Sequence, residues 1–197
     1  PPGFDAANVI SFRVAVGGQR YEDARLLFAL YQRFLDEGGQ LPGVQSMALT
    51  SQLPFAEDQD NAGLTAEERA ETARPGDGPD AQRFAVTADY FKTLRIPVLR
   101  GRAFTIADVV DSEPVVILNE TAARALWADG NALDKKVRVA GGEGNPFRRV
   151  VGIVGDVAPG DLGARAKAQA YLPIAQFFPA DVTGVVRMTA PNAAPLR

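Results

Sequence analysis

The sequence predicts an α+β domain in which helices lie to one side of mixed β-sheets. Apolar and polar residues alternate over residues 10–16, which is typical of a half-buried strand. Apolar residues then recur at helical spacing over residues 24–35. A second succession of strand-like and helix-like patterns follows from residue 84. Two β-α-β rounds of similar size therefore indicate a weak internal duplication.

The first round consists of two strands with a helix between them. The alternating residues 10–16 form its first strand. The helix begins near Asp23 and ends at the glycine pair 38–39. Residues 44–51 predict the second strand, so the helix covers one face of a sheet.

Residues 55–82 differ in charge from the rest of the chain. Eight acidic residues stand there against two arginines, so this segment carries −6 and the remainder about +3 of the total charge of −3. Thr65 and Glu68 have the spacing of a capping box, which predicts one short helix. We interpret the segment as a variable acidic insertion and expect the rest of it to be solvated and mobile.

The second round opens with a short strand at residues 84–87 and a brief helix at residues 89–94. The continuous apolar run 114–118 predicts a strand that is buried on both faces. Asn119 is a suitable N-cap for the next helix, which is expected to end near Gly130.

Further strands and a linker complete the chain. That last helix is expected to bury Ala123, Leu126 and Trp127. Strands are predicted at residues 136–139, 149–155 and 182–188. The proline-rich residues 189–197 are interpreted as an exit linker.

Composition excludes several classes of function. The 197 residues carry a net charge of −3, which argues against a nucleic-acid binder. Cysteine and histidine are both absent, which excludes disulfides, thiol nucleophiles and Ser-His-Asp triads. No apolar stretch approaches the ~20 residues that cross a bilayer. The chain starts without methionine and ends at Arg197, so we expect it to be a piece of a longer protein.

Two sets of residues are candidates for ligand binding. One is a set of glycines that accompanies the strand at 149–155, and the other is a group of acidic residues in the 55–82 segment. The glycine spacing matches neither the dinucleotide-binding motif nor the P-loop, so a glycine-rich turn is favoured over a phosphate site. The acidic residues lack EF-hand spacing, so a solvated loop is favoured over a calcium site. These residues are Gly152, Gly155, Gly160 and Gly163, and Glu57, Asp58 and Asp60.

Other candidates are an acid–base pair, a basic patch and an aromatic pair. Asp156 and Asp161 are more simply turn residues that bond their own backbone. For the aromatic pair Phe177 and Phe178, a packing role is favoured over ligand binding. The basic residues are scattered through extended segments, which favours salt-bridged or solvated faces; they are Arg100, Arg102, Lys135, Lys136, Arg138, Arg148 and Arg149. The sequence assembles no active site, and we expect no catalytic, cofactor-binding or metal-binding residues.

Five segments together carry a family resemblance. They read PGFDAANVISFRV with LPGVQSMALTSQLPF at the start, then YFKTLRIPVLRGRAF (90–104), PVVILNETAARALW (114–127), RVVGIVGDV (149–157) and YLPIAQ (171–176). In this order and at these separations they resemble the MacB-like periplasmic core domain of bacterial ABC-transporter permeases. Within the MacB/FtsX family, the chain is most similar to the acidobacterial duplicated orphan type. The resemblance covers nearly the whole of residues 1–197.

The resemblance implies a fold of two lobes. A porter-like lobe would combine the N-terminal round with the C-terminal return, and an inserted lobe would come from the middle of the chain. It also implies a multi-pass parent with one transmembrane helix before Pro1 and others after the domain. This domain would then lie at the periplasmic face of the bacterial inner membrane.

The resemblance further implies a function without catalysis. The domain would transmit an ATP-driven conformational change and contact substrate or a partner protein during export. Its partners would be a cytoplasmic ABC ATPase subunit or domain, a second permease copy or half, and a periplasmic protein. No cofactor and no nucleic acid is implied.

Two positions depart from the family pattern. The family commonly has glycine where this chain has Arg95, and Gly-Lys where it has Asp134-Lys135. Glycine suits a left-handed backbone at such places, and a left-handed arginine would cost about 1 kcal/mol. Aspartate tolerates that conformation better, so both changes concern local turns only.

Two other functions stay open. A stand-alone extracytoplasmic domain could bind a small molecule in a cleft near residues 155–163, which predicts a saturable thermal shift. A hydrolytic or transfer enzyme could use Asp156 or Asp161, which predicts turnover that is lost when either becomes asparagine.

Overall fold

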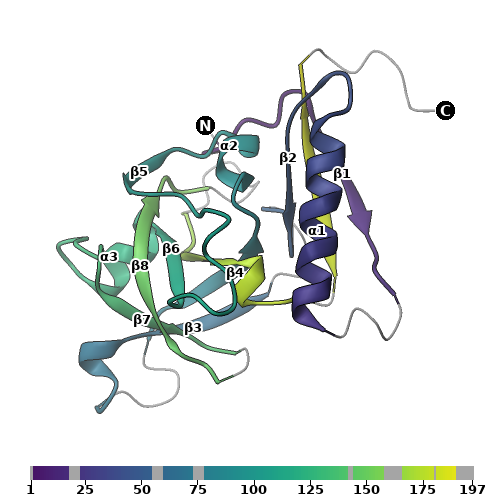
Figure 1. Ribbon diagram of the computed structural model, residues 1–197. Coiled ribbons are helices and arrows are strands. Elements are labelled where there is room, and N and C mark those ends of the chain that lie inside the picture. Colours follow the sequence, from purple (N-terminus) through teal and green to yellow (C-terminus); the bar gives the residue numbers. More distant parts are fainter. Residues whose placement is uncertain are drawn as a thin grey trace.

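The computed structural model describes residues 2–17, 23–54, 60–72, 78–141, 144–157, 166–179 and 181–189. One lobe combines the two ends of the chain (Figure 1). Its strands are β1 (Val9–Val14), β2 (Val44–Thr50) and β10 (Val182–Met188). Because β10 pairs antiparallel with both β1 and β2, these two strands run parallel, with β10 between them.

Helix α1 (Ala24–Gly39) covers one face of this three-stranded sheet (Figure 1). The carboxylate of Asp23 caps it by accepting from the backbone N–H groups of Arg25 and Leu26. Its apolar side is anchored by the buried Tyr31, which packs with Leu49 of the sheet. The first predicted β-α-β round is therefore confirmed, with the last strand of the chain inserted into it.

The second lobe is a closed ring of six strands. They are β3 (Asn61–Ala66), β4 (Asp80–Val86), β6 (Val115–Asn119), β7 (Lys136–Val139), β8 (Phe147–Val154) and β9 (Gln169–Pro173). The pairing order β4-β3-β7-β8-β6-β9 closes on β4 through a parallel β4–β9 ladder. The β6–β8 pair is also parallel and the remaining pairs are antiparallel, so the ring is mixed. Strand β5 (Val98–Gly101) pairs outside the ring with β8.

Helix α3 (Glu120–Leu126) packs on the core of the ring. Asn119 caps it as predicted, because its side-chain oxygen accepts from the N–H of Ala122. Ala123, Leu126 and Trp127 are buried as predicted. The helix ends at Leu126 rather than near Gly130.

The lobes are joined through α2 (Tyr90–Leu94) and a single β2–β4 register pair, Thr50 with Val86. Tyr90 and Phe91 of α2 belong to an aromatic core that also contains residues of β2, β10 and the ring. Phe91 meets the ring of Tyr171 edge-on, with centroids 5.0 Å apart. Burial of such aromatic surface stabilises the junction between the lobes.

The structure corrects two predictions. Residues 61–66 of the supposed solvated insertion form β3, whose Ala62, Leu64 and Ala66 are buried in the ring. Thr65 lies within this strand, and the short 3₁₀ helix η2 (Glu67–Arg69) follows without a side-chain cap. The two rounds are also not built alike, because the first lobe is an open sheet and the second a closed ring.

Strands β5 and β9 and a second 3₁₀ helix, η3 (Ile174–Gln176), were not predicted. The α+β class, the mixed pairing and the division into a terminal lobe and a middle lobe are confirmed. The predicted linker 189–197 lies outside the described residues except for Thr189, whose N–H donates to the carbonyl of Gly43.

Arg95 and Asp134 have left-handed backbones, with φ of 55° and 60°, as the family pattern suggested. Arg95 also forms an ion pair with Asp5 at 2.7 Å. Arg95→Gly and Arg95→Ala both remove that ion pair, so their difference reports the backbone alone. We expect the glycine variant to be more stable than the alanine variant by about 1 kcal/mol in denaturant unfolding. An alanine variant of equal or greater stability would contradict this.

Candidate functional site

The glycine-rich turn has a packing explanation. A Cβ at Gly152 would lie 2.3 Å from the carbonyl oxygen of Arg102, so the close approach of β5 to β8 requires glycine there. The N–H of Gly155 donates to Pro97 at 2.9 Å and is not available to a phosphate. Gly160 and Gly163 lie outside the described residues.

The acidic candidates that are described have structural partners. Asp60 forms a two-pronged ion pair with Arg83, at 2.9 Å for each contact. Asp156 accepts from the N–H and hydroxyl of Thr121, at 2.9 and 2.7 Å, and so fixes the start of α3. Glu57, Asp58 and Asp161 lie outside the described residues. Among the described residues no cluster of carboxylates is arranged to hold a metal ion.

The cleft expected near residues 155–163 is described only at residues 155–157. Gly155 packs on Pro97, Asp156 binds Thr121, and Val157 is buried in the aromatic core. This part of the segment is therefore filled by the protein's own contacts.

Three of the seven basic candidates form salt bridges at separate places, as predicted. Arg102 makes two contacts of 2.8 Å with Asp108, and Arg149 bonds Glu113 and Asp134. Lys136 pairs with Glu67 at 3.7 Å. The others have neutral neighbours: Arg100 donates to the carbonyl of Gly130, Lys135 lies over the ring of Trp127 and Arg138 over that of Phe147.

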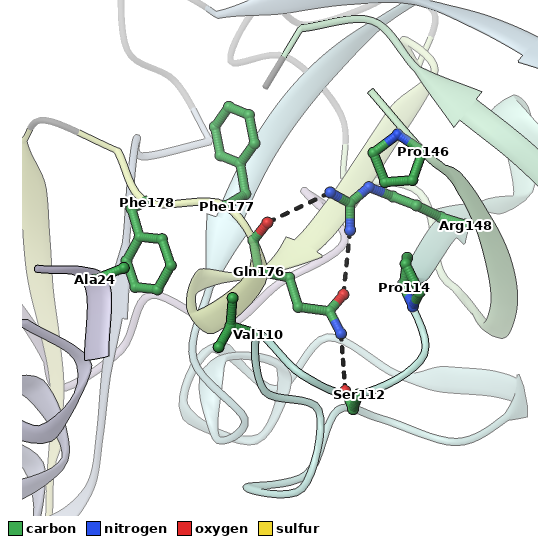
Figure 2. Close-up of a pocket in the computed structure, with 9 residues that line it drawn as sticks. All are labelled: Ala24, Val110, Ser112, Pro114, Pro146, Arg148, Gln176, Phe177 and Phe178. Atoms are coloured by element: carbon green, nitrogen blue, oxygen red, sulfur yellow. Dashed lines mark hydrogen bonds between the residues drawn. The ribbon is translucent and has the colours of Figure 1, made fainter. Parts of the chain in front are cut away.

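Arg148 is different, and it lines the pocket that Figure 2 shows. The pocket encloses about 460 Å³ between the first residue of α1 and the segment that leads into β6. Arg148 donates to the side-chain oxygen of Gln176 at 3.1 Å and to its carbonyl at 3.4 Å (Figure 2). The residue is 5% exposed, and in the described part of the chain no carboxylate lies within ion-pair distance of it.

Gln176 holds the floor of this pocket in place. Its side-chain nitrogen donates to the hydroxyl of Ser112 and to the carbonyls of Val109 and Glu113, at 3.0–3.1 Å. Its side-chain oxygen also accepts from the N–H of Val115. Gln176 could not be singled out from sequence, because a lone glutamine after a buried strand has no distinctive spacing.

The electrostatic environment of Arg148 is positive. Burial lowers the pKa of its guanidinium, and the nearby charge of Arg83 lowers it further. Arg83 itself lies over the ring of Phe177, 4.5 Å from the centroid. Phe177 and Phe178 are half-buried, so the aromatic pair packs as predicted and also forms one wall of the pocket (Figure 2).

A second buried arginine joins the two ends of the chain to α2. Arg187 of β10 is 2% exposed and donates to the carbonyl of Thr93 at the end of α2, at 2.7 Å. It also donates to the carbonyls of Asp5 and Ala7 in the segment before β1. The signal in the sequence was a charged residue within the apolar strand 182–188, but its partners are distant in sequence.

The loop beside the pocket is tied down by Asp108. Burial would raise the pKa of its carboxyl, but hydrogen bonds from Arg102 and Thr105 outweigh burial and hold the pKa below its ordinary value. A carboxyl with a lowered folded-state pKa stabilises the protein above its unfolded pKa, and this contribution is lost as pH falls through the folded value.

Asp108→Asn is therefore expected to cost about 1–2 kcal/mol at pH 7 and progressively less below about pH 4. Urea unfolding at several pH values measures this. Asp111→Asn, whose carboxylate is largely exposed, is the control and should change little at any pH. A deficit in Asp108→Asn that is unchanged at pH 3 would contradict the assignment.

None of the helices in the described part of the chain is long and apolar enough to cross a membrane. The sequence pattern of the MacB-like periplasmic core domain family matches residues 4–195.

Two curated proteins share shorter segments with the chain. The uncharacterized ABC transporter permease YvrN of Bacillus subtilis (strain 168) is 36% identical over 72 residues, which are 36% of this chain and 17% of that protein. The macrolide export ATP-binding/permease protein MacB of Aggregatibacter actinomycetemcomitans is 36% identical over 76 residues, 39% of this chain and 11% of that protein. The matched segments thus span less than a fifth of either relative.

Solved structures share the fold over most of the chain. The periplasmic region of MacB from Actinobacillus actinomycetemcomitans superposes with a TM-score of 0.59 at 18% identity, covering 98% of this chain and 78% of that one. The extracellular domain of the noncanonic ABC-type transporter YknZ from Gram-positive bacteria gives 0.57 at 16% identity, covering 93% and 84%.

Proposed function

The chain belongs to the family of MacB-like periplasmic core domains, and we propose that it is a non-catalytic, extracytoplasmic domain of an ABC-type permease. It transmits an ATP-driven conformational change from membrane-spanning segments to the extracytoplasmic side of the membrane. On this proposal it lies at the periplasmic face of the inner membrane and works with a cytoplasmic ATPase and a second permease copy or half. Contact with cargo or a periplasmic partner protein belongs to the same proposal.

The observation that carries this proposal is the set of contacts by which Arg187 joins the two ends of the fold to α2, here called the Arg187 junction. The chain enters and leaves the fold at one place, because the N–H of Met188 donates to the carbonyl of Asn8 at 2.8 Å. The side chain of Arg187, which belongs to the leaving strand β10, bonds both the entering segment and the end of α2. A displacement applied to either end of the fold therefore reaches α2, which is packed into the core shared with the ring.

The packing of the cores supports transmission from one lobe to the other. The ring has its own apolar core, whereas the core beneath α1 also contains Ala85 of β4 and Ile174 of η3. Closely packed cores do not deform continuously, so a pull on the ends is expected to be passed on to the ring rather than absorbed locally.

A single introduced cysteine tests location. The chain has no cysteine, so Ile106→Cys, at a residue that is 75% exposed, gives one reactive thiol in this domain. In intact cells that make the full-length permease, a membrane-impermeant maleimide should label it without permeabilisation. Labelling only after the membrane is opened would overturn the proposed location.

The same site tests movement. With a spin label on Ile106→Cys in the permease assembled with its ATPase, the distance between the two copies should change between the nucleotide-free and ATP-trapped states. An ATPase with a disabled nucleotide site is the control and should show no change. An unchanged distance in a permease that hydrolyses ATP normally would contradict mechanical transmission.

A further inference from the structure

Arg148 is a buried cation, and among the described residues it has no anionic partner. The other fully buried arginine, Arg187, lies 3.4 Å from the carboxylate of Asp5, and the half-buried Arg83 and Arg149 are paired with carboxylates. Among the described residues the half-buried Arg138 has no ion pair either, but its guanidinium lies over the ring of Phe147. Arg148 has only the neutral oxygens of Gln176.

This arrangement is energetically unfavourable unless an anion completes it. Burying an ion without a counter-charge costs several kcal/mol, and an arginine does not escape that cost by losing its proton. The two contacts to Gln176 use only part of the five N–H donors of a guanidinium. A structural role as a tie between β8 and η3 would be served by a neutral donor at lower cost.

The walls of the pocket indicate what kind of anion fits. Pro114 and Pro146 supply apolar surface beside Arg148, Val110 and Phe178 supply it farther along the pocket, and Ser112 supplies a hydroxyl (Figure 2). One unpaired positive charge matches a single negative charge. The volume of about 460 Å³ holds an apolar group as well as the anion itself.

We propose that this pocket binds a carboxylate that carries an apolar group, with the carboxylate on Arg148 and the apolar group against Val110 and Phe178. A carboxylate accepts two parallel N–H bonds from one guanidinium, whereas inorganic phosphate would leave the apolar walls unused. The ligand is either a free organic acid or the C-terminus of a peptide. The proposal stands independently of the permease function, because it concerns binding to the 197-residue chain alone.

Calorimetry with matched probes tests the chemistry. We expect 3-phenylpropanoate to bind saturably, and 3-phenylpropanamide, acetate and inorganic phosphate to bind at least about tenfold more weakly. The peptide Ala-Ala-Phe as free acid and as amide distinguishes the two sources. If the free-acid peptide binds more tightly than both its amide and 3-phenylpropanoate, the ligand is a peptide C-terminus. If 3-phenylpropanoate binds more tightly than the peptide, the ligand is a free organic acid.

A pair of variants at the pocket rim tests the site without removing Arg148. Val110 is 46% exposed, so both replacements are expected to fold. Both replacements remove the apolar contact of Val110, but Val110→Glu also places a competing carboxylate beside the pocket. It should therefore bind 3-phenylpropanoate roughly tenfold or more weakly than Val110→Gln, which has the same shape without the charge. Equal affinities in the two variants would overturn the proposal.

Arg148→Met should abolish binding, and Arg100→Met, which removes an arginine that also donates to a carbonyl, should leave it unchanged. If Arg148→Met does not fold, the Val110 pair decides. Absence of binding by both acids to the unaltered chain at millimolar concentration would also overturn the proposal, as would binding that the Arg148→Met variant retains.

Discussion

Asn119→Ala is expected to lower the free energy of unfolding by about 3 kcal/mol. The side chain is fully buried where β6 passes into α3. Its oxygen accepts from the N–H of Ala122 and from the N–H of Gln169, both at 2.9 Å, and its nitrogen donates to the carbonyl of Lys167 at 2.8 Å. Alanine would leave two buried donors without partners and remove the cap of α3.

Denaturant unfolding followed by circular dichroism measures the loss. Asn131→Ala is the control, because that exposed residue sits in the turn after α3 and should change stability by less than about 0.5 kcal/mol. Asn119→Asp keeps the accepting oxygen but places a charge in the core, so it should not restore stability. A loss below about 1 kcal/mol in Asn119→Ala would show that water or a relaxed backbone replaces these bonds.

The same residue shows why some of the fold could be predicted. An N-cap depends on residues adjacent in sequence, so Asn119 before an apolar helical pattern was sufficient. Its bonds to Lys167 and Gln169 join residues about 50 positions apart, and they depend on the closed ring. The ring itself closes through the β4–β9 ladder, and no local pattern specifies a long-range register.

Strand β3 shows where local pattern fails. Its sequence NAGLTA has no β-branched residue except Thr65, and it is flanked by acidic residues. The burial of Ala62, Leu64 and Ala66 comes from the surrounding ring, which small side chains allow to close tightly. Composition therefore indicated a solvated segment where tertiary packing forms a core strand.

The neighbours Arg148 and Arg149 illustrate the limit for the candidate site. Successive strand residues point to opposite faces, so Arg149 reaches Glu113 and Asp134 at the surface while Arg148 turns inward. The predicted strand began at residue 149, two residues after its actual start at Phe147, so Arg148 was left out of the alternation. A strand boundary error of two residues thus concealed the one buried, unpaired cation of the described pocket.

Arg187→Met should cost about 3 kcal/mol or more and should loosen the segment before β1, which is then held to the end of α2 by the bond from the N–H of Asp5 to the carbonyl of Leu94 and by the Asp5–Arg95 ion pair. Methionine has a similar length and keeps the apolar packing of the stem, but it leaves the carbonyls of Thr93, Asp5 and Ala7 without their donor. Arg13→Met is the matched control, because Arg13 lies on the adjacent strand β1 and is exposed. It is expected to change stability by less than about 0.5 kcal/mol.

Hydrogen exchange separates the junction from a general loss of stability. In Arg187→Met, the amides of residues 4–9 and 93–96 should exchange faster than those of the ring core, whereas a uniform increase would indicate global unfolding alone. In the full-length permease the same variant should retain ATP hydrolysis while the distance between labels at Ile106→Cys no longer responds to nucleotide. A response as large as that of the unaltered protein would show that movement reaches the ring without Arg187, through the aromatic core of α2 and the contacts of Asp5 with Leu94 and Arg95.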